Sequence, residues 1–170
     1  MKIRNGFVSN SSSSSFIVAF DKTPSTIQEM KEILFGNEEW YENPYADLLN
    51  PAGFTTQQVA ETVFTDLQRE QPLSPENLVE EVKNGHFDGY PTYDWRLEKD
   101  ETMEQSRERW RRHDIKVSQA AKNLADKFIQ DNNGKVFFKF HYSDNNGTYE
   151  TALEHGGLFD KLPHLVVSHH

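Results

Sequence analysis

Short apolar runs rich in β-branched and aromatic residues lie near the two ends of the chain. Residues 16–20 read FIVAF, residues 136–143 read VFFKFHYS and residues 164–168 read HLVVS. An Asp-Asn-Asn-Gly sequence follows the second run, and Asn-Gly favours the left-handed backbone of a hairpin turn. We therefore expect residues 136–143 to pair with residues 148–153 in a β-hairpin. The pattern predicts one strand near the N-terminus and three strands near the C-terminus.

Apolar positions in the middle of the chain recur at spacings of three and four residues, which is typical of amphipathic helices. Ser25, with a glutamine three residues later, has the spacing of a capping box and predicts the start of a first helix. Thr55 or Thr56 caps a second helix. Ser74 followed by Pro75 predicts a third, because the N–H that proline lacks is not needed in the first turn of a helix.

The longest helical pattern runs from about residue 101 to residue 131. Met103, Trp110, Val117 and Leu124 recur every seven residues and form one apolar stripe. A stripe at this spacing predicts a helix face that packs in the core.

Together these elements predict an α+β fold. The strands at 16–20, 136–143, 148–153 and 164–168 would form a small, mainly antiparallel sheet, with about four helices packed on it. At 170 residues the chain is long enough for one domain with a real core. No internal repeat or linker interrupts the pattern, so we expect a single domain over residues 1–170.

The charge of the chain narrows the classes of partner. The net charge is −9 and the isoelectric point is near 5.2, and an acidic surface repels phosphate backbones, so nucleic acid is disfavoured as a partner. A basic cluster of four arginines and one histidine lies within residues 107–113. Carboxylates at spacings of three and four residues can pair with these arginines. A self-neutralised helix face is therefore favoured over a patch for an acidic partner.

Cysteine content and hydropathy exclude several kinds of site and of membrane or secreted protein. The chain has no cysteine, which removes disulfides, thiolate metal ligands and cysteine nucleophiles. No run approaches the roughly 20 apolar residues that a membrane span needs, and the N-terminus does not have the apolar segment of a signal peptide. We expect a cytoplasmic protein without membrane contact.

Histidines concentrate at the C-terminal end, where five of the seven lie within the last 36 residues. Imidazole together with carboxylate suits divalent transition metals such as Zn, Mn, Fe or Ni. If the chain is extended from His164 to His170, these two side chains lie about 20 Å apart and cannot share an ion. A smaller set is left, in which Glu154 and His155 are the candidate catalytic residues and the candidate metal ligands are His155, His164, His141 and Asp144.

In this set Glu154 acts either as a general base or as a further metal ligand. No HExxH motif or other helical zinc motif supports the site. The alternative interpretation is that these histidines cap strands, hydrogen-bond to backbone carbonyls or fill the edge of the core.

A run of five serines precedes the first strand, in the sequence NSSSSSF. It is interpreted either as an exposed lead-in to that strand or as an ordered loop whose N–H groups and hydroxyls bind an anion. The run has neither the glycines nor the lysine of a phosphate-binding loop, and no GxSxG motif indicates a serine nucleophile. If the run binds an anion, the candidate ligand-binding residues are Asn10, Ser11, Ser12, Ser13 and Ser14.

The two ends of the chain carry a recognisable combination of motifs. The opening RNGFVSNSSSSSF at 4–16 is similar to the start of many small bacteriophage and bacterial proteins that have no assigned activity. The ending, with YSD at 142–144, LEHG at 153–156, PH at 163–164 and SHH at 168–170, resembles the close of a subset of that family. The likeness covers about a quarter of the chain.

This resemblance implies a phage or bacterial origin, a location in the host cytoplasm if the chain is phage-encoded, and a native histidine ending. Because two distant ends recur together, it also implies that the ends meet in the fold.

Three functional hypotheses remain open. The first is a non-enzymatic binding or accessory protein, whose partner would be a host protein or a second copy of the chain. The second is a metal-dependent hydrolase or nuclease-like enzyme at the C-terminal histidine site, with a divalent transition metal as cofactor. The third is a phosphate or nucleotide binder that uses the serine-rich loop. The lack of a complete catalytic motif favours the first hypothesis.

Overall fold

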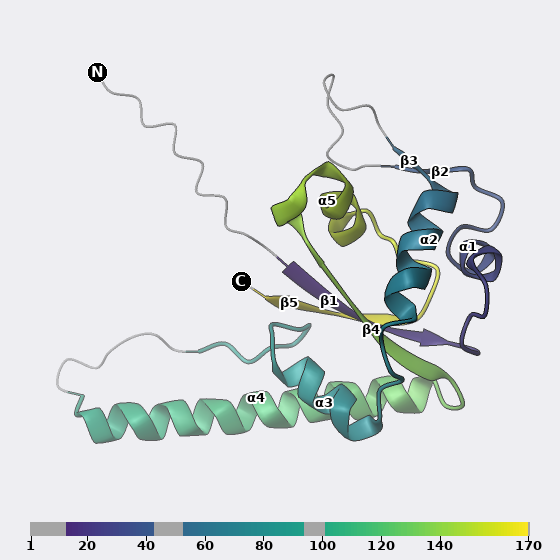
Figure 1. The fold of residues 1–170 in the computed structure, drawn as a ribbon. Helices are drawn as coiled ribbons and strands as arrows, with labels where there is room; N and C mark the ends of the chain where they lie inside the picture. The colour runs from purple at the N-terminus through teal and green to yellow at the C-terminus, as the bar shows by residue number, and fades with distance from the viewer. Residues whose placement is uncertain (1–12, 43–52, 94–100, 170) are drawn as a thin grey trace, which may run out of the picture.

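The computed structural model describes residues 13–42, 53–93 and 101–169 of the chain. Within these residues the fold is α+β, as predicted, and a three-stranded antiparallel sheet lies between two groups of helices (Figure 1). The sheet has the order β4-β1-β5 and is formed by β1 (Ser13–Phe20), β4 (Val136–Ser143) and β5 (His164–His169), while β2 (Trp40–Tyr41) and β3 (Phe54–Thr55) form a separate two-stranded sheet. The helices are α1 (Ile27–Phe35), α2 (Thr56–Leu67), α3 (Pro75–Lys83), α4 (Met103–Asp131) and α5 (Thr148–His155), and a short 3₁₀ helix, η1 (Asp144–Asn146), joins β4 to α5.

Strand β1 is the centre of the main sheet and pairs on both sides. Phe16 lies opposite Phe140 of β4 and opposite Val166 of β5. Helices cover both faces of β1, which explains why its sequence is a continuous apolar run rather than an alternating one. Ser13 lies opposite His169, so the N-terminal and C-terminal ends of the described chain are adjacent. This confirms, for the described residues, the expectation that the two ends meet.

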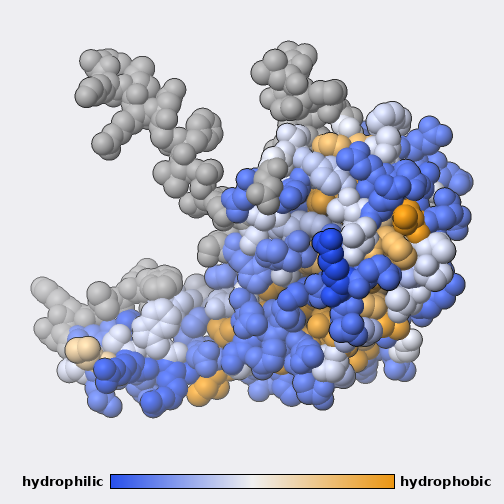
Figure 2. Space-filling view, in the orientation of Figure 1, coloured by the Kyte–Doolittle hydropathy of each residue, from blue (hydrophilic) through white to orange (hydrophobic). Residues whose placement is uncertain are grey.

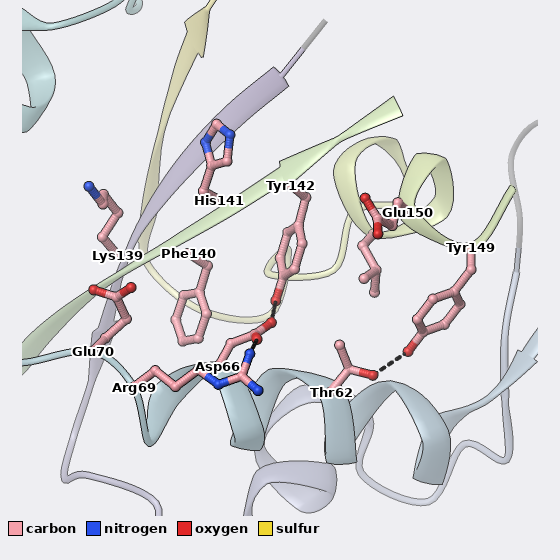
Figure 3. Close-up of a pocket in the computed structure, with 11 residues that line it drawn as sticks. Thr62, Asp66, Arg69, Glu70, Lys139, Phe140, His141, Tyr142, Tyr149 and Glu150 are labelled. Atoms are coloured by element: carbon pink, nitrogen blue, oxygen red, sulfur yellow. Dashed lines mark hydrogen bonds and ion pairs between the residues drawn. The ribbon is translucent and has the colours of Figure 1, made fainter. Parts of the chain in front are cut away.

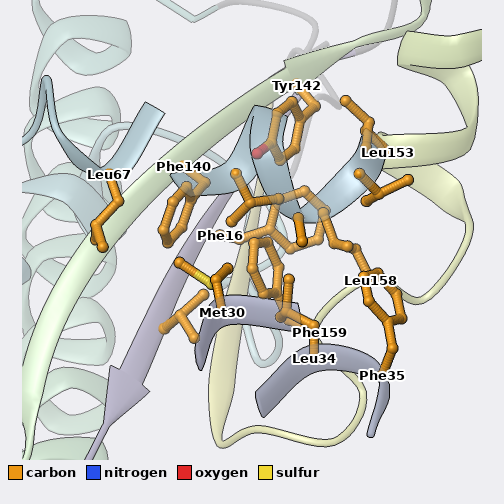
Figure 4. Packing of buried hydrophobic residues seen from close by; sticks show 14 of the residues in the cluster. Phe16, Met30, Leu34, Phe35, Leu67, Phe140, Tyr142, Leu153, Leu158 and Phe159 are labelled. Atoms are coloured by element: carbon orange, nitrogen blue, oxygen red, sulfur yellow. The ribbon is translucent and has the colours of Figure 1, made fainter. Parts of the chain in front are cut away.

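Alternate residues of β1 enter two separate cores. Phe16, Val18 and Phe20 face the first core, on the side of α1, α2 and α5. Tight burial of such side chains contributes roughly 1.5–3 kcal/mol each to folding. Figure 4 shows this core, whose labelled members besides Phe16 are Met30, Leu34, Phe35, Leu67, Phe140, Tyr142, Leu153, Leu158 and Phe159.

Ile17 and Ala19 face the second core, on the side of α3 and α4. Ala121 and Ala125 of α4 are fully buried there, and their small side chains allow the helix to approach the sheet closely. The other buried members of this core are Leu78, Val82, Phe87, Val117, Phe128 and Val167.

Only the C-terminal half of α4 packs on the sheet. Val117 is 5% exposed, whereas Met103 is 76% and Trp110 is 48% exposed, and apolar side chains are visible along this end of the helix at the lower left of Figure 2. The cause is that α4 is longer than the strands on which it packs. A 29-residue helix spans about 43 Å, whereas an eight-residue strand spans about 27 Å. The prediction of one continuous core stripe is therefore wrong for its first two positions.

None of the described helices, α4 included, is long and apolar enough to cross a membrane.

Two of the three predicted helix N-caps are confirmed, and one is wrong by one residue. Thr55 and Ser74 are the N-caps of α2 and α3, as predicted. Helix α1 begins one residue later than expected, because Thr26 accepts the hydrogen bond from the Glu29 backbone N–H at 3.1 Å. Ser25 instead donates its N–H and its hydroxyl to the Glu29 carboxylate, at 2.8 and 2.9 Å.

The predicted C-terminal hairpin is wrong. Residues 148–153 lie in helix α5 rather than in a strand, because β1 takes the place beside β4 that the return strand would have occupied. On the outer edge of β4, Leu73 donates its N–H to the Phe137 carbonyl at 2.8 Å. As a helix, the return segment buries Ala152 and Leu153, both good helix formers, in the first core.

Candidate functional site

The serine run ends in the sheet rather than in a loop. Ser13, Ser14 and Ser15 belong to β1, and they pair with both β4 and β5. Backbone N–H groups that take part in sheet pairing are not available to converge on an anion. The predicted anion-binding loop is therefore wrong for Ser13 and Ser14, and the other candidates, Asn10, Ser11 and Ser12, lie outside the described residues.

Ser14 instead contacts a group of residues on the α5 side of the sheet, which we call the carboxylate–histidine cluster (Ser14, Asp144, Glu154 and His155). The Ser14 hydroxyl donates to Glu154 Oε1 at 3.0 Å, and His155 Nε2 lies 3.5 Å from Glu154 Oε2. One possible ligand atom from each of Asp144, Glu154 and His155 lies within 4.8 Å of the other two. Ligand atoms around one ion at bond lengths of about 2.0–2.2 Å lie roughly 3–4 Å apart, so small side-chain adjustments would complete a three-ligand site.

The backbone around α5 determines where the cluster lies. Gly147, with a φ of 105°, connects the η1 turn that carries Asp144 to the first turn of the helix. Tyr41 donates its hydroxyl to the Ala152 carbonyl at 2.7 Å and so packs against the last turn. A Cβ at Gly156 would lie 2.2 Å from the Tyr41 hydroxyl oxygen, so this contact requires glycine at the end of the helix.

The cluster concentrates negative charge in a buried position. Glu154 is 5% exposed, Asp144 is half-buried and the His155 side chain is 33% exposed. A buried carboxylate is costly unless it is paired, and the carbonyls at the C-terminal end of α5 add further negative potential. A bound cation would offset both contributions.

A pocket of about 350 Å³ adjoins the cluster. Ser14, Glu154 and His155 line it together with His164 at the start of β5. His164 Nδ1 donates to the Leu162 carbonyl at 3.0 Å, since the carbonyl can only accept, and this bond fixes the orientation of the ring. The remaining lining residues include Phe16, Phe159, Asp160, Val166 and Ser168.

The structure brings together only part of the predicted metal set. Asp144, Glu154 and His155 form the cluster, and His164 lines the adjoining pocket without joining the three-ligand group. His141 lies on the opposite face of β4, because side chains alternate along a strand and its neighbours Phe140 and Tyr142 face the first core. The prediction that His141 shares a metal ion with His155 is therefore wrong.

His141 belongs instead to a histidine pair on the α3 side of the sheet. The Ser15 hydroxyl oxygen lies 3.3 Å from His141 Nδ1 and 3.0 Å from His169 Nε2. Burial, followed by the nearby His141, lowers the pKa of His169. Within the described residues this pair has no third metal-ligating group, since Asp144, Glu154 and His155 are the one such group of three.

A second pocket, of about 390 Å³, lies between α2, β4 and α5 (Figure 3). Tyr142 donates its hydroxyl to Asp66 Oδ2 at 3.3 Å, and Arg69 lies 3.7 Å from Asp66 Oδ1. Burial raises the pKa of Asp66, and burial with the neighbouring carboxylate raises the pKa of Tyr142 well above its usual range. Asp66 thus accepts the hydrogen bond of the buried Tyr142 hydroxyl. No sequence motif joins these two residues, so sequence reasoning missed this pocket.

Comparison of the chain with protein-family models, with curated proteins and with solved structures gives no match.

Proposed function

We propose that the chain binds one divalent transition metal ion at the carboxylate–histidine cluster and hydrolyses a substrate in the adjoining pocket. The observation that carries this proposal is the convergence of Asp144, Glu154 and His155 ligand atoms within 4.8 Å of one another. Two carboxylates and one imidazole suit Zn, Mn or Fe. Three protein ligands also leave a coordination position for water, which is the arrangement of catalytic rather than structural sites.

Each residue of the cluster has a role in this proposal. Asp144, Glu154 and His155 bind the ion, and the 3.0 Å hydrogen bond from Ser14 holds the Glu154 carboxylate in position. A bound ion supplies an activated water and polarises the bond to be cleaved. His164 and Asp160, which line the same pocket, are placed to accept or donate protons to a substrate there.

Elemental analysis of protein purified without an affinity tag, after dialysis and after reconstitution with Zn²⁺ or Mn²⁺, tests the metal site. We expect about one equivalent per chain. His155→Ala should lose the metal, because it removes the imidazole ligand. His113→Ala on α4 is the matched control and should keep it. Equal metal content in the two variants, or no metal in the wild type after reconstitution, would refute the site.

Hydrolysis is tested separately, with p-nitrophenyl phosphate and p-nitrophenyl acetate as probes. We expect turnover that is removed by a chelator, restored by added metal and lost in Glu154→Gln. A variant that binds no metal yet hydrolyses a probe at the wild-type rate would contradict the proposed mechanism.

A binding or accessory protein is the second candidate, and the projecting half of α4 favours it. Met103 and Trp110 are exposed there by 76% and 48%. They lie seven residues apart and so share one face of the helix, and exposed apolar side chains that share a face can form a contact surface. If the partner is a second copy, sedimentation velocity should show a dimer that Trp110→Glu abolishes. Asn123→Glu, on the exposed side of the packed half of α4, is the control and should leave the dimer intact. A monomer at all concentrations would exclude self-association.

A further inference from the structure

A pocket of about 300 Å³ lies against the N-terminal half of α4, on the side of the sheet opposite to α5. No part of the carboxylate–histidine cluster contributes to it. Its lining residues are Thr92, Tyr93, Arg109, Arg112, His113 and Lys116.

The spacing of the α4 residues explains why the pocket is basic. Arg109, Arg112, His113 and Lys116 follow one another at i, i+3, i+4 and i+7, and residues at these spacings share one face of a helix. Three permanent cations and one imidazole therefore line a single pocket in a chain of net charge −9.

Two of these cations have no counter-charge within the described structure. Arg109 pairs with Glu101 at 2.9 Å and lies over the Tyr93 ring at 5.5 Å. Neither Arg112 nor Lys116 forms an ion pair with another described residue. Like charges at a spacing of four residues repel each other on a helix, and an anion between them would relieve this repulsion.

The same ion pairs correct the expectation of a self-neutralised face. Arg109 is neutralised by Glu101, and Arg111 is neutralised by Glu108 at 2.8 Å. The expectation is wrong for Arg112, which faces the pocket.

We propose that this pocket binds the phosphate group of a phosphate monoester. The Arg112 guanidinium offers a planar pair of donors that matches phosphate oxygens, and Lys116 adds a point charge. The Thr92 hydroxyl provides a third donor on the pocket wall. Two cations that form no ion pair among the described residues balance a dianion, which a monoester phosphate is near neutral pH.

The aromatic residues beside the pocket are packed against each other. Tyr93 lines the pocket and stacks on Trp110, with ring centroids 4.3 Å apart and an interplanar angle of 22°. Arg109 also lies over the Tyr93 ring, at 5.5 Å from its centroid. Recognition therefore depends on the phosphate group, and AMP, phosphoserine and inorganic phosphate should bind with similar affinities.

Isothermal titration calorimetry at low salt, with AMP, phosphoserine and inorganic phosphate as titrants, tests the proposal on the full chain. The variant with both Arg112→Gln and Lys116→Gln should lose at least about tenfold in affinity for all three, because it removes charge-assisted hydrogen bonds. The matched control is Arg111→Gln, on the same helix but outside the pocket, and its affinity should change by less than about twofold.

Three outcomes would overturn the proposal. They are no binding of any titrant by the wild type, an equal loss in Arg111→Gln, and binding of succinate as tight as that of phosphate. Arg112 and Lys116 are exposed, so their variants should fold, and circular dichroism would check this. Glu154→Gln should bind AMP as the wild type does, so the test is independent of the proposed metal centre.

Discussion

Binding of a metal ion at the carboxylate–histidine cluster should raise the thermal stability of the protein. The perturbation is the addition of Zn²⁺ or Mn²⁺ at about 100 times its dissociation constant. An ion that binds only the folded state then adds about 2.7 kcal/mol to the free energy of unfolding. The unfolded chain does not hold Asp144 and Glu154 near each other, so this differential affinity follows from the fold.

The size of the shift follows from the length of the chain. Unfolding entropy is about 2.1 cal/mol/K per residue near 60 °C, which gives roughly 0.36 kcal/mol/K for 170 residues. A stabilisation of about 2.7 kcal/mol therefore corresponds to an increase in Tm of about 7.5 °C.

Differential scanning calorimetry of the wild type and two variants is the assay. Glu154→Gln keeps the shape of the side chain and the hydrogen bond to Ser14, so its Tm without metal should stay within a few degrees of the wild type. Its Tm should not respond to the ion. Asp160→Asn is the control, because Asp160 lines the same pocket but lies outside the three-ligand group, and it should keep most of the shift.

A shift of equal size in the wild type and in Glu154→Gln would place the bound ion elsewhere and refute the cluster as the metal site. The absence of any shift in the wild type, at metal concentrations up to the millimolar range, would do the same.

Three further predictions concern the fold. Gly156→Ala should lower the free energy of unfolding by about 2–4 kcal/mol, because the new methyl group would lie 2.2 Å from the Tyr41 hydroxyl oxygen; an unchanged urea midpoint would contradict this packing. In the same urea assay, Trp110→Ala should cost under about 1 kcal/mol, whereas Leu78→Ala in the second core should cost about 2–5 kcal/mol, and equal losses would mean that Trp110 is covered in solution. Because the pKa of His169 is lowered in the folded protein, the unfolded chain binds a proton at this imidazole more tightly than the folded chain does. The contribution of the neutral His169 to the free energy of unfolding is therefore complete above the unfolded pKa of about 6.5, and it declines as the pH falls below that value. His169→Gln should flatten that part of the pH profile of unfolding free energy, and a profile identical to the wild type would refute the assignment.

Local signals in the sequence predicted where several elements begin and end. The caps at Thr55 and Ser74 lie where side-chain oxygens meet the first N–H groups of α2 and α3. Strand β4 has the predicted bounds of 136–143. The cap contacts join residues three positions apart, and the apolar composition of residues 136–143 is typical of a strand, so spacing and composition are sufficient to locate these features.

Strand pairing could not be read from such signals. The Asn-Gly sequence after β4 favoured a hairpin, yet β4 pairs with β1, more than 100 residues earlier in the chain. Residues 148–153 are compatible with either a strand or a helix, and the choice depended on which segment occupied the place beside β4. The same limit applies to α4, whose stripe extends past the sheet because strand length, not helix periodicity, sets the end of the second core.

The sequence by itself determined the α+β class, the terminal strands and the residue types available for chemistry, because these depend on local patterns. The tertiary structure decided which of those residues meet. Sheet pairing brings Ser14 within 3.0 Å of Glu154, 140 residues away, and helix formation at 148–155 places Glu154 and His155 beside Asp144. The two-residue alternation of β4 sends His141 to the opposite face. Register and face are properties of strands that are far apart in the chain, so only the folded structure establishes them.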